Sequence, residues 1–254
     1  MEHYEDNKDF LDAIKESFLS YLKNGSRSTE KLLPLHGYIA SRLLQLLGHD
    51  YDVLSLGIGN GKELVVPGKY YDKRIDITIR HRDSDNQIVI AGIAVKFIMS
   101  NYGQNSNNYF ENMIEETANI RSNNILYFQI FLSQEILPHF YQDGSIKAWE
   151  SLSSHHLDKY YALVNDSPQE NKHVPNKTFL GIVQLGHPET SKIKNKEDYA
   201  RFFNAQEFAS TFSEKKYEDS SYLIYNNFER YIQGVALEIK EYVNKIENKK
   251  TTTA

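Results

Sequence analysis

The sequence predicts a mixed α/β fold in which a central sheet lies between helices, and three observations lead to this prediction. Residues 74–98 have the pattern of a two-stranded hairpin, residues 107–121 that of an amphipathic helix, and residues 125–132 that of a buried strand. The order helix, hairpin, helix and strand is typical of a mixed sheet flanked by helices. Because 254 residues are enough to bury a substantial core, we expect a single domain over residues 1–254.

Two helices are expected before the hairpin. The first covers residues 7–23 and carries apolar side chains at helical spacing, namely Phe10, Ile14, Phe18 and Leu22. The second runs from about Leu35 to Leu47 and ends at Gly48, a typical C-cap residue. With the hairpin, the next helix and the next strand, it forms an expected core over residues 35–132.

Beyond residue 138 the periodicity is weaker. A helix is expected after Ser153 and a strand over residues 178–185, which we assign to the core sheet. Further helices are expected over about 197–214 and 225–247. The segment from about 139 to 250 is therefore expected to be a largely helical elaboration of the core.

The composition excludes several classes of protein. There is no apolar run long enough to cross a membrane, and the polar, acidic N-terminus is unlike a secretory signal. The absence of cysteine excludes disulfides and thiolate metal sites and fits a reducing compartment. We expect a cytoplasmic protein without membrane partners.

The charge is unevenly distributed. The whole chain carries a formal net charge of −5, but residues 62–82 hold six cationic and three acidic side chains. Partners respond to such a local field rather than to the net charge. Five of these cations are candidate contacts to a phosphate backbone, namely Lys69, Lys73, Arg74, Arg80 and Arg82.

The second strand of the hairpin contains the segment AGIAVKFI, in which Lys96 interrupts an apolar run. Because side chains alternate across a strand, Lys96 lies on the face opposite to Val95 and Phe97. In the first strand, RIDITIR, Asp76 lies opposite to the isoleucines. If the apolar faces coincide, Asp76 and Lys96 emerge together, either as a structural ion pair or as half of a phosphodiesterase site.

This hairpin resembles the core of the PD-(D/E)XK nucleases, the superfamily of many type II restriction endonucleases, over roughly residues 35–132. The resemblance implies a restriction-endonuclease-like fold, hydrolysis of DNA phosphodiester bonds and Mg²⁺ as the cofactor. Asp76 matches the first acid of the motif and Lys96 its lysine. The acid expected two residues before the lysine is replaced by Ala94, which cannot bind a metal.

One subgroup of these nucleases carries the second acid on the following helix, after about fourteen residues. Here that position is Glu111, and Glu115 lies one turn later on the same helix face. The resemblance also implies the carbonyl of Val95 as a metal ligand and Glu63 as an additional acid. The alternative explanation of Ala94 is a dead site, which would make the protein a non-catalytic DNA-binding or assembly module.

The resemblance implies double-stranded DNA as the substrate and a sequence-specific restriction endonuclease as the activity, with a repair or mobile-element nuclease as an alternative. Cutting both strands requires two sites, so we expect a homodimer, with a cognate methyltransferase in the same system but not necessarily in contact. The apolar face of the last helix is a candidate dimer interface or part of the core; its residues are Phe228, Ile232, Val235, Ile239 and Val243.

The segment NYGQNSNNY contains Asn101 and Gln104, whose amides are candidates for contacts with adenine edges, although an ordinary polar loop has the same composition. The glycine-rich segment GIGNGKE lacks the spacing of a phosphate-binding loop and is expected to be a loop without that function.

Overall fold

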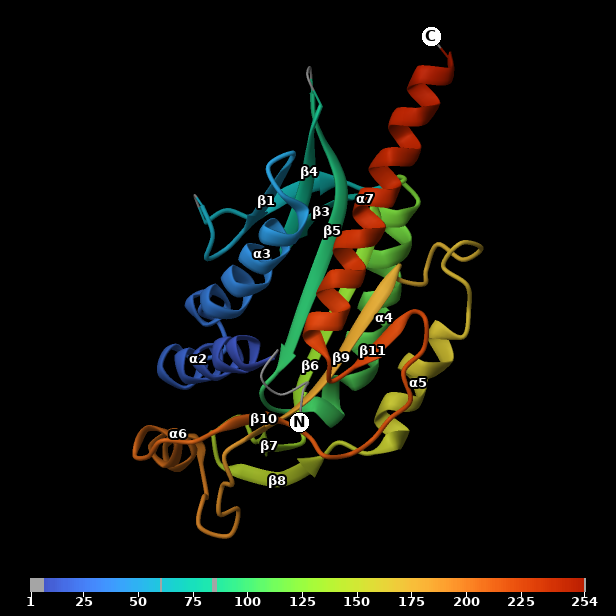
Figure 1. Ribbon diagram of the computed structural model, residues 1–254. Helices are drawn as coiled ribbons and strands as arrows, with labels where there is room; N and C mark the ends of the chain where they lie inside the picture. Colours follow the sequence, from blue (N-terminus) through green and yellow to red (C-terminus); the bar gives the residue numbers. More distant parts are fainter. Residues whose placement is uncertain (1–6, 60, 84–85, 254) are drawn as a thin grey trace.

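The computed structural model describes residues 7–59, 61–83 and 86–253 and has a seven-stranded mixed sheet with helices on both faces (Figure 1). The helices are α2 (Lys8–Asn24), η1 (Glu30–Leu32), α3 (Leu33–Leu47), α4 (Tyr102–Arg121), α5 (Ser154–Val164), α6 (Lys196–Asn204) and α7 (Phe228–Thr253). The large sheet contains β1 (Tyr51–Ser55), β4 (Ile77–Asp83), β5 (Asn86–Ile98), β6 (Leu126–Gln134), β9 (Lys177–Leu185), β10 (Ser210–Phe212) and β11 (Leu223–Tyr225). Two small sheets pair β2 (Leu64–Pro67) with β3 (Asp72–Ile75), and β7 (Ile136–Phe140) with β8 (Ile146–Ser151).

The large sheet has the strand order β1-β4-β5-β6-β9-β10, with β11 also paired to β9. Strands β1, β4 and β5 are antiparallel neighbours, whereas β5, β6 and β9 are parallel. The crossover from β5 to β6 is made by α4, as a parallel connection requires. The expected mixed α/β fold with a central mixed sheet flanked by helices is thus confirmed.

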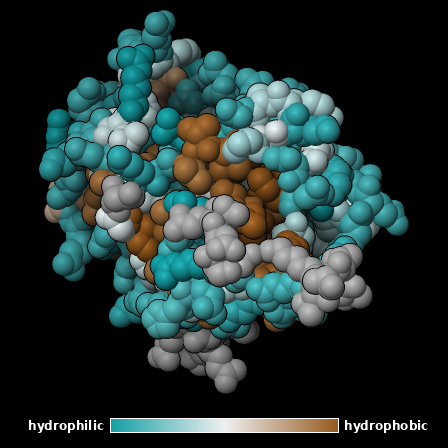
Figure 2. All heavy atoms as spheres, turned by 90° about the horizontal axis from the view of Figure 1, so that it is seen from above, coloured by the Kyte–Doolittle hydropathy of each residue, from teal (hydrophilic) through white to brown (hydrophobic). Residues whose placement is uncertain are grey.

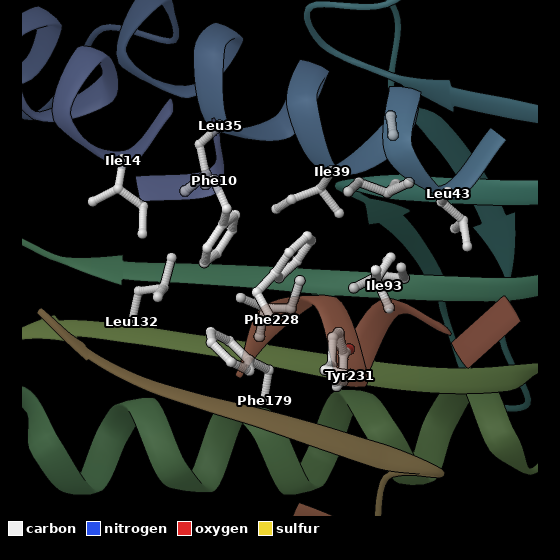
Figure 3. Packing of buried hydrophobic residues seen from close by; sticks show 14 of the residues in the cluster. Phe10, Ile14, Leu35, Ile39, Leu43, Ile93, Leu132, Phe179, Phe228 and Tyr231 are labelled. Atoms are coloured by element: carbon white, nitrogen blue, oxygen red, sulfur yellow. The ribbon is translucent and has the colours of Figure 1, made fainter. Parts of the chain in front are cut away.

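One face of the sheet is covered by α2, α3 and α7, and the largest apolar cluster lies beneath these helices (Figure 3). Phe10 of α2 and Phe228 of α7 stack with ring centroids 3.8 Å apart, and Phe179 of β9 meets both rings edge-on. Such fully buried aromatic rings contribute a large share of the hydrophobic stabilisation of a domain. This face is closed.

The opposite face is covered mainly by α4 and α5 and contains two smaller apolar clusters. One cluster includes Met113 of α4 with Phe131 of β6, and the other includes Ile120 of α4 with Tyr127 of β6.

Looking down on the molecule from above, Figure 2 shows hydrophobic residues gathered in one central region surrounded by hydrophilic ones.

Most expected elements are present, and two expected element boundaries were wrong. The helix expected over 197–214 ends at Asn204, because residues 210–212 form β10 against β9. Helix α4 begins at Tyr102 rather than at residue 107, so most of NYGQNSNNY is helical and not a loop. Of the two alternatives for the apolar residues of α7, the structure agrees with the core, since each of them is at most 4% exposed.

Among the helices of the described part of the chain, none combines the length and the apolar character that a membrane span requires.

Candidate active site

The two strands of the predicted hairpin separate at Asp76. Strand β4 pairs with β5 from Asp83 back to Ile77, and the preceding strand β3 turns away to pair with β2. At the point of separation, the Asp76 carboxylate accepts a hydrogen bond from the Val95 N–H at 2.7 Å. The side chain therefore replaces the backbone partner that β4 no longer offers, and it is held firmly against β5.

A cavity of about 240 Å³ opens at this separation. Asp76, Ala94, Val95 and Lys96 line it from the hairpin side, Gln129 from β6 and Glu116 from α4. Asp76 and Lys96 therefore lie on the same side of the hairpin, as the sequence predicted. Ile77, Ile79, Val95 and Phe97 all pack on the opposite, closed face.

Lys96 is exposed rather than buried, which explains how an apolar strand tolerates it. Its ammonium nitrogen lies 4.5 Å from the centroid of the Tyr109 ring of α4, a cation–π contact that holds the stem over the cavity. The positive charge of Lys96 acts on Asp76, on which it lowers the pKa. Because Lys96 is exposed and lines the cavity, its ammonium group can contact a ligand there.

The carboxyl group of Asp76 has a pKa raised to about 6. Burial is the main cause, and the negative charge of Glu116 adds to it, while the hydrogen bond from Val95 acts in the opposite direction. Carboxylates that are packed together without enough positive charge show this behaviour, and it is frequent at functional sites.

Asp76 also belongs to a second group of side chains, on the side of α3. One ligand atom each of His36, Glu63 and Asp76 lies within 4.8 Å of the others. His36 is 1% exposed, and neither of its ring nitrogens has a hydrogen-bond partner among the described residues. Burial lowers the pKa of His36 to about 4, so the ring is neutral at pH 7 and can act as a ligand.

The pKa of Glu63 is raised, first by burial and then by the negative charge of Asp76. Two carboxylates and a neutral imidazole facing one another form an arrangement that a divalent cation would stabilise, because it would offset the repulsion and give the imidazole a partner. The three residues together therefore form a candidate metal centre.

A contact between two glycines brings α3 close enough for His36 to reach this group. A Cβ at Gly37 of α3 would lie 2.7 Å from the carbonyl oxygen of Gly57, and a Cβ at Gly57 would lie 2.2 Å from the carbonyl oxygen of Leu33. Gly57 also has a φ of 77°, which L-residues rarely adopt. The glycine-rich segment thus packs its backbone against α3, next to the candidate metal centre.

The acid of α4 that lines the cavity is Glu116, and the structure does not bring Glu111 to the cavity lining. Glu116 forms an ion pair with Lys73, and the Tyr127 hydroxyl donates to it at 3.5 Å. Glu111 is exposed and acts electrostatically on Lys159, while Glu115 is exposed and lies against Tyr71. The reason is helical phase, because Glu116 follows Met113 by one turn on the face that packs on the sheet.

The predicted phosphate contacts are divided among three places. Lys73 and Arg74 line the cavity, and Lys69 is exposed on the turn between β2 and β3. Arg80 and Arg82 lie on β4, which runs away from the cavity, and Arg82 pairs with Asp52 of β1.

The two amides considered for base contacts are also separate from the cavity lining. The Asn101 amide donates to the Phe140 carbonyl at 2.9 Å and accepts from the Phe140 N–H at 3.2 Å, so it joins α4 to β7. Both the donor and the acceptor of this amide are thus used within the protein. Gln104 is exposed on the first turn of α4.

The residues of the site that were not predicted in these roles include His36, Glu116 and Gln129. His36 lies at helical spacing from Ala40, Leu43 and Leu47, and a histidine on an apolar helix face is a signal that the sequence contains. Gln129 is 4% exposed within β6, and its amide donates to Thr117 at 3.3 Å.

Comparison with known proteins finds no matching family model, no matching curated protein and no matching solved structure.

Proposed function

We propose that this protein is a metal-dependent endonuclease that hydrolyses DNA phosphodiester bonds, with a restriction-endonuclease-like core. The core would consist of α3, the strands β1, β4 and β5, the crossover helix α4 and β6. The order and pairing of these elements support this assignment, since they agree with the order expected from the resemblance to the PD-(D/E)XK nucleases. The remaining strands and helices extend the sheet beyond β6 and cover it.

His36, Glu63 and Asp76 would hold the metal ion. The carbonyl of Val95 is a further candidate ligand, because the N–H and C=O of one strand residue face the same edge and the Val95 N–H faces Asp76. Residue 95 also lies beyond Ile93, which is the last β5 residue paired with β4. Glu63 and His36 thus take the role that the sequence alone assigned to Glu111.

The donor set bears on which ion binds. The resemblance implies Mg²⁺, which prefers oxygen ligands in strict octahedral geometry. An imidazole nitrogen beside two carboxylates suits a first-row transition ion such as Mn²⁺ at least as well. A divalent cation at this position would supply Lewis-acid stabilisation of the negative charge that develops on the phosphate.

The residues around the cavity would bind and orient the substrate. Lys96, held over the cavity by Tyr109, would position the attacking water and offset charge on the phosphate. Arg74 is exposed at the cavity and would contact a phosphate of the backbone. Lys73 would do so after exchanging its ion pair with Glu116 for the DNA.

One observation carries the proposal: a buried histidine without hydrogen-bond partners among the described residues faces two carboxylates, one of which shares a cavity with Lys96. Leaving a buried polar group unpaired costs about 1–3 kcal/mol. The arrangement is therefore expected to persist because a ligand compensates for it.

The test uses plasmid and phage DNA with the purified full chain in Mg²⁺ or Mn²⁺, beside EDTA. We expect cleavage that disappears in EDTA and in Asp76→Asn, His36→Asn and Lys96→Ala. His49→Asn, a change at an exposed histidine outside the site, is the matched control and should cleave normally. Discrete fragments would identify a sequence-specific restriction endonuclease, and random degradation a less specific repair or mobile-element nuclease.

A second candidate function follows from Ala94, which lines the cavity at the position of the missing acid. Intact DNA on all substrates and in both metals, together with retained DNA binding, would overturn the catalytic proposal and identify a non-catalytic DNA-binding module. Titration of Mn²⁺ into the wild type and into His36→Asn distinguishes the two further. A working site predicts at least about a tenfold loss of metal affinity in the variant.

A further inference from the structure

The turn between β2 and β3 presents an unusually exposed aromatic side chain. Tyr70 is 77% exposed, more than any other large hydrophobic or aromatic side chain among the residues described as exposed. Lys69 on one side and Tyr71 on the other are exposed as well. Packing in the core therefore does not explain why this turn carries a tyrosine.

The backbone of this turn is nevertheless fixed by a buried residue. Asn119 of α4 is 1% exposed, and its amide oxygen accepts hydrogen bonds from the Tyr70 N–H at 2.9 Å and the Tyr71 N–H at 3.3 Å. Its amide nitrogen donates to the Tyr71 carbonyl at 2.9 Å, and its own carbonyl accepts from the Lys69 N–H at 3.0 Å. The hydrogen bonds of a buried side chain thus fix the backbone conformation of a surface turn.

The fit between turn and helix leaves no space for adjustment. A Cβ at Gly68 would lie 2.1 Å from the Asn119 amide nitrogen. Asn123, one turn further along α4, donates to the Pro67 carbonyl at 2.8 Å. The backbone that carries Tyr70 is therefore held rigidly, which reduces the conformational entropy lost when its ring contacts a ligand.

The turn is also connected directly to the candidate active site. Strand β3 leads from Asp72 to Ile75 and so to Asp76 in the cavity. Six residues of extended chain span at most about 20 Å, which corresponds to about six base-pair steps of DNA. Lys69 beside Tyr70, and Arg74 between the turn and the cavity, supply positive charge along this path.

We propose that Tyr70 stacks on a base of the bound nucleic acid, within about six base pairs of the cleaved bond. The inference rests on the proposed function and adds the way in which the DNA is held. Aromatic rings flanked by cations are typical of surfaces that bind exposed bases, and side chains wedged into a base step open it for such a contact. A protein partner is disfavoured because charged Lys69 and Asp72 interrupt the apolar surface.

The test is photo-cross-linking of the full chain, in EDTA to prevent cleavage, to DNA fragments in which 5-iodouracil replaces part of the thymine. Affinity is measured in parallel by fluorescence anisotropy at several salt concentrations. The variants are Tyr70→Ala, Tyr70→Phe, Lys69→Ala and Tyr141→Ala. Tyr141, which follows β7 and is 53% exposed, is the matched control for an exposed tyrosine away from the cavity.

We expect a cross-link at Tyr70, an affinity reduced about tenfold in Tyr70→Ala and unchanged in Tyr70→Phe, and an unaltered salt dependence in both. Lys69→Ala should instead lower the slope of log affinity against log salt by about 1, and Tyr141→Ala should have no effect. Thermal unfolding of each variant checks that the fold is retained.

Two results would overturn this inference and leave the proposed function intact. The first is that Tyr70→Ala binds DNA as tightly as the wild type, and the second is that the cross-links map to other residues. A changed oligomeric mass in Tyr70→Ala with unchanged DNA binding would overturn it in favour of a protein interface. Absence of DNA binding by the wild type in EDTA, together with absence of DNA cleavage in Mg²⁺ and Mn²⁺, would overturn the proposed function and, with it, the role of Tyr70.

Discussion

The two faces of the central sheet are packed in different ways, although they share the same strands. Toward α2, α3 and α7, β5 contributes Ile90, Ala91, Ile93, Val95 and Phe97 to the large apolar cluster, and Ile93 is completely buried. Toward α4, the same strand presents Gly92, Ala94 and Lys96, and a polar cavity separates two apolar clusters. One face thus stabilises the fold, and the other leaves space for a ligand.

The difference is instructive because stability and function are assigned to alternate residues of one strand. Space on the α4 side comes from small side chains and from the separation of β3 and β4 at Asp76. Two groups at this point are unfavourable for the folded protein by themselves. Burial raises the pKa of Asp76, which lines the cavity, and leaves His36, on the side of α3, unpaired among the described residues. Sites that bind ligands commonly contain such arrangements.

The largest expected effect contrasts two nearby residues of β5. Ile93→Ala removes a fully buried side chain from the closed face and should lower the free energy of unfolding by about 2–5 kcal/mol. Lys96→Met, on the open face, should change it by less than about 1 kcal/mol while abolishing cleavage. Urea unfolding measures the first quantity, and a large destabilisation by Lys96→Met would contradict the division between the faces.

A smaller effect is expected for the acids of α4. Glu116→Gln should reduce DNA cleavage about 10- to 100-fold, because Glu116 lines the cavity and holds Lys73 and Tyr127 in place. Glu111→Gln, on an exposed position of the same helix, should leave cleavage within about twofold. Equal losses in the two variants would show that the helix phase does not select the functional acid.

The smallest effect concerns stability and pH. Without metal, Asp76→Asn should stabilise the protein at pH 7 by on the order of 1–3 kcal/mol. The pKa of Asp76 is raised to about 6 from an unfolded value near 3.8, so the unfolded state releases its proton first and wild-type stability falls, through this group, as pH rises from about 4 to 6.

Comparing the two proteins measures the ionisation of Asp76 together with its effect on the pKa of Glu63, because His36 and Glu63 are present in both. The difference in unfolding free energy should be largest above pH 6 and should disappear near pH 4. Chemical denaturation in EDTA across this range measures it. A difference that is independent of pH would show that the ionised carboxylate is not the cause.

Local patterns were sufficient for the elements and for one pair of site residues. The alternation in RIDITIR and AGIAVKFI brought Asp76 and Lys96 to one side because a strand has a period of two residues. The end of α3 at Gly48 followed from capping chemistry, and Gly48 has a φ of 90° there. The helix expected over 197–214 was wrong because pairing with β9 outweighs helical propensity at residues 210–212.

The acid on α4 shows where spacing was insufficient. The resemblance, with fourteen residues between Lys96 and the acid, selected Glu111, but the phase of the helix relative to the sheet brings Glu116 to the cavity. The spacing of Met113, Thr117 and Ile120 contained that phase, because Glu116 lies between them on the buried face.

The sequence by itself determined the mixed α/β class, the order of the core elements and the side of the hairpin on which Asp76 and Lys96 emerge, because these depend on periodicities of a few residues. Only the tertiary structure decided that His36, Glu63 and Asp76 form one group. These residues are far apart in the chain, and they meet because α3 approaches the turn at Gly57 and β3 separates from β4. Contacts between residues so far apart in the chain depend on how whole helices and strands pack, and local sequence patterns carry no information about this packing.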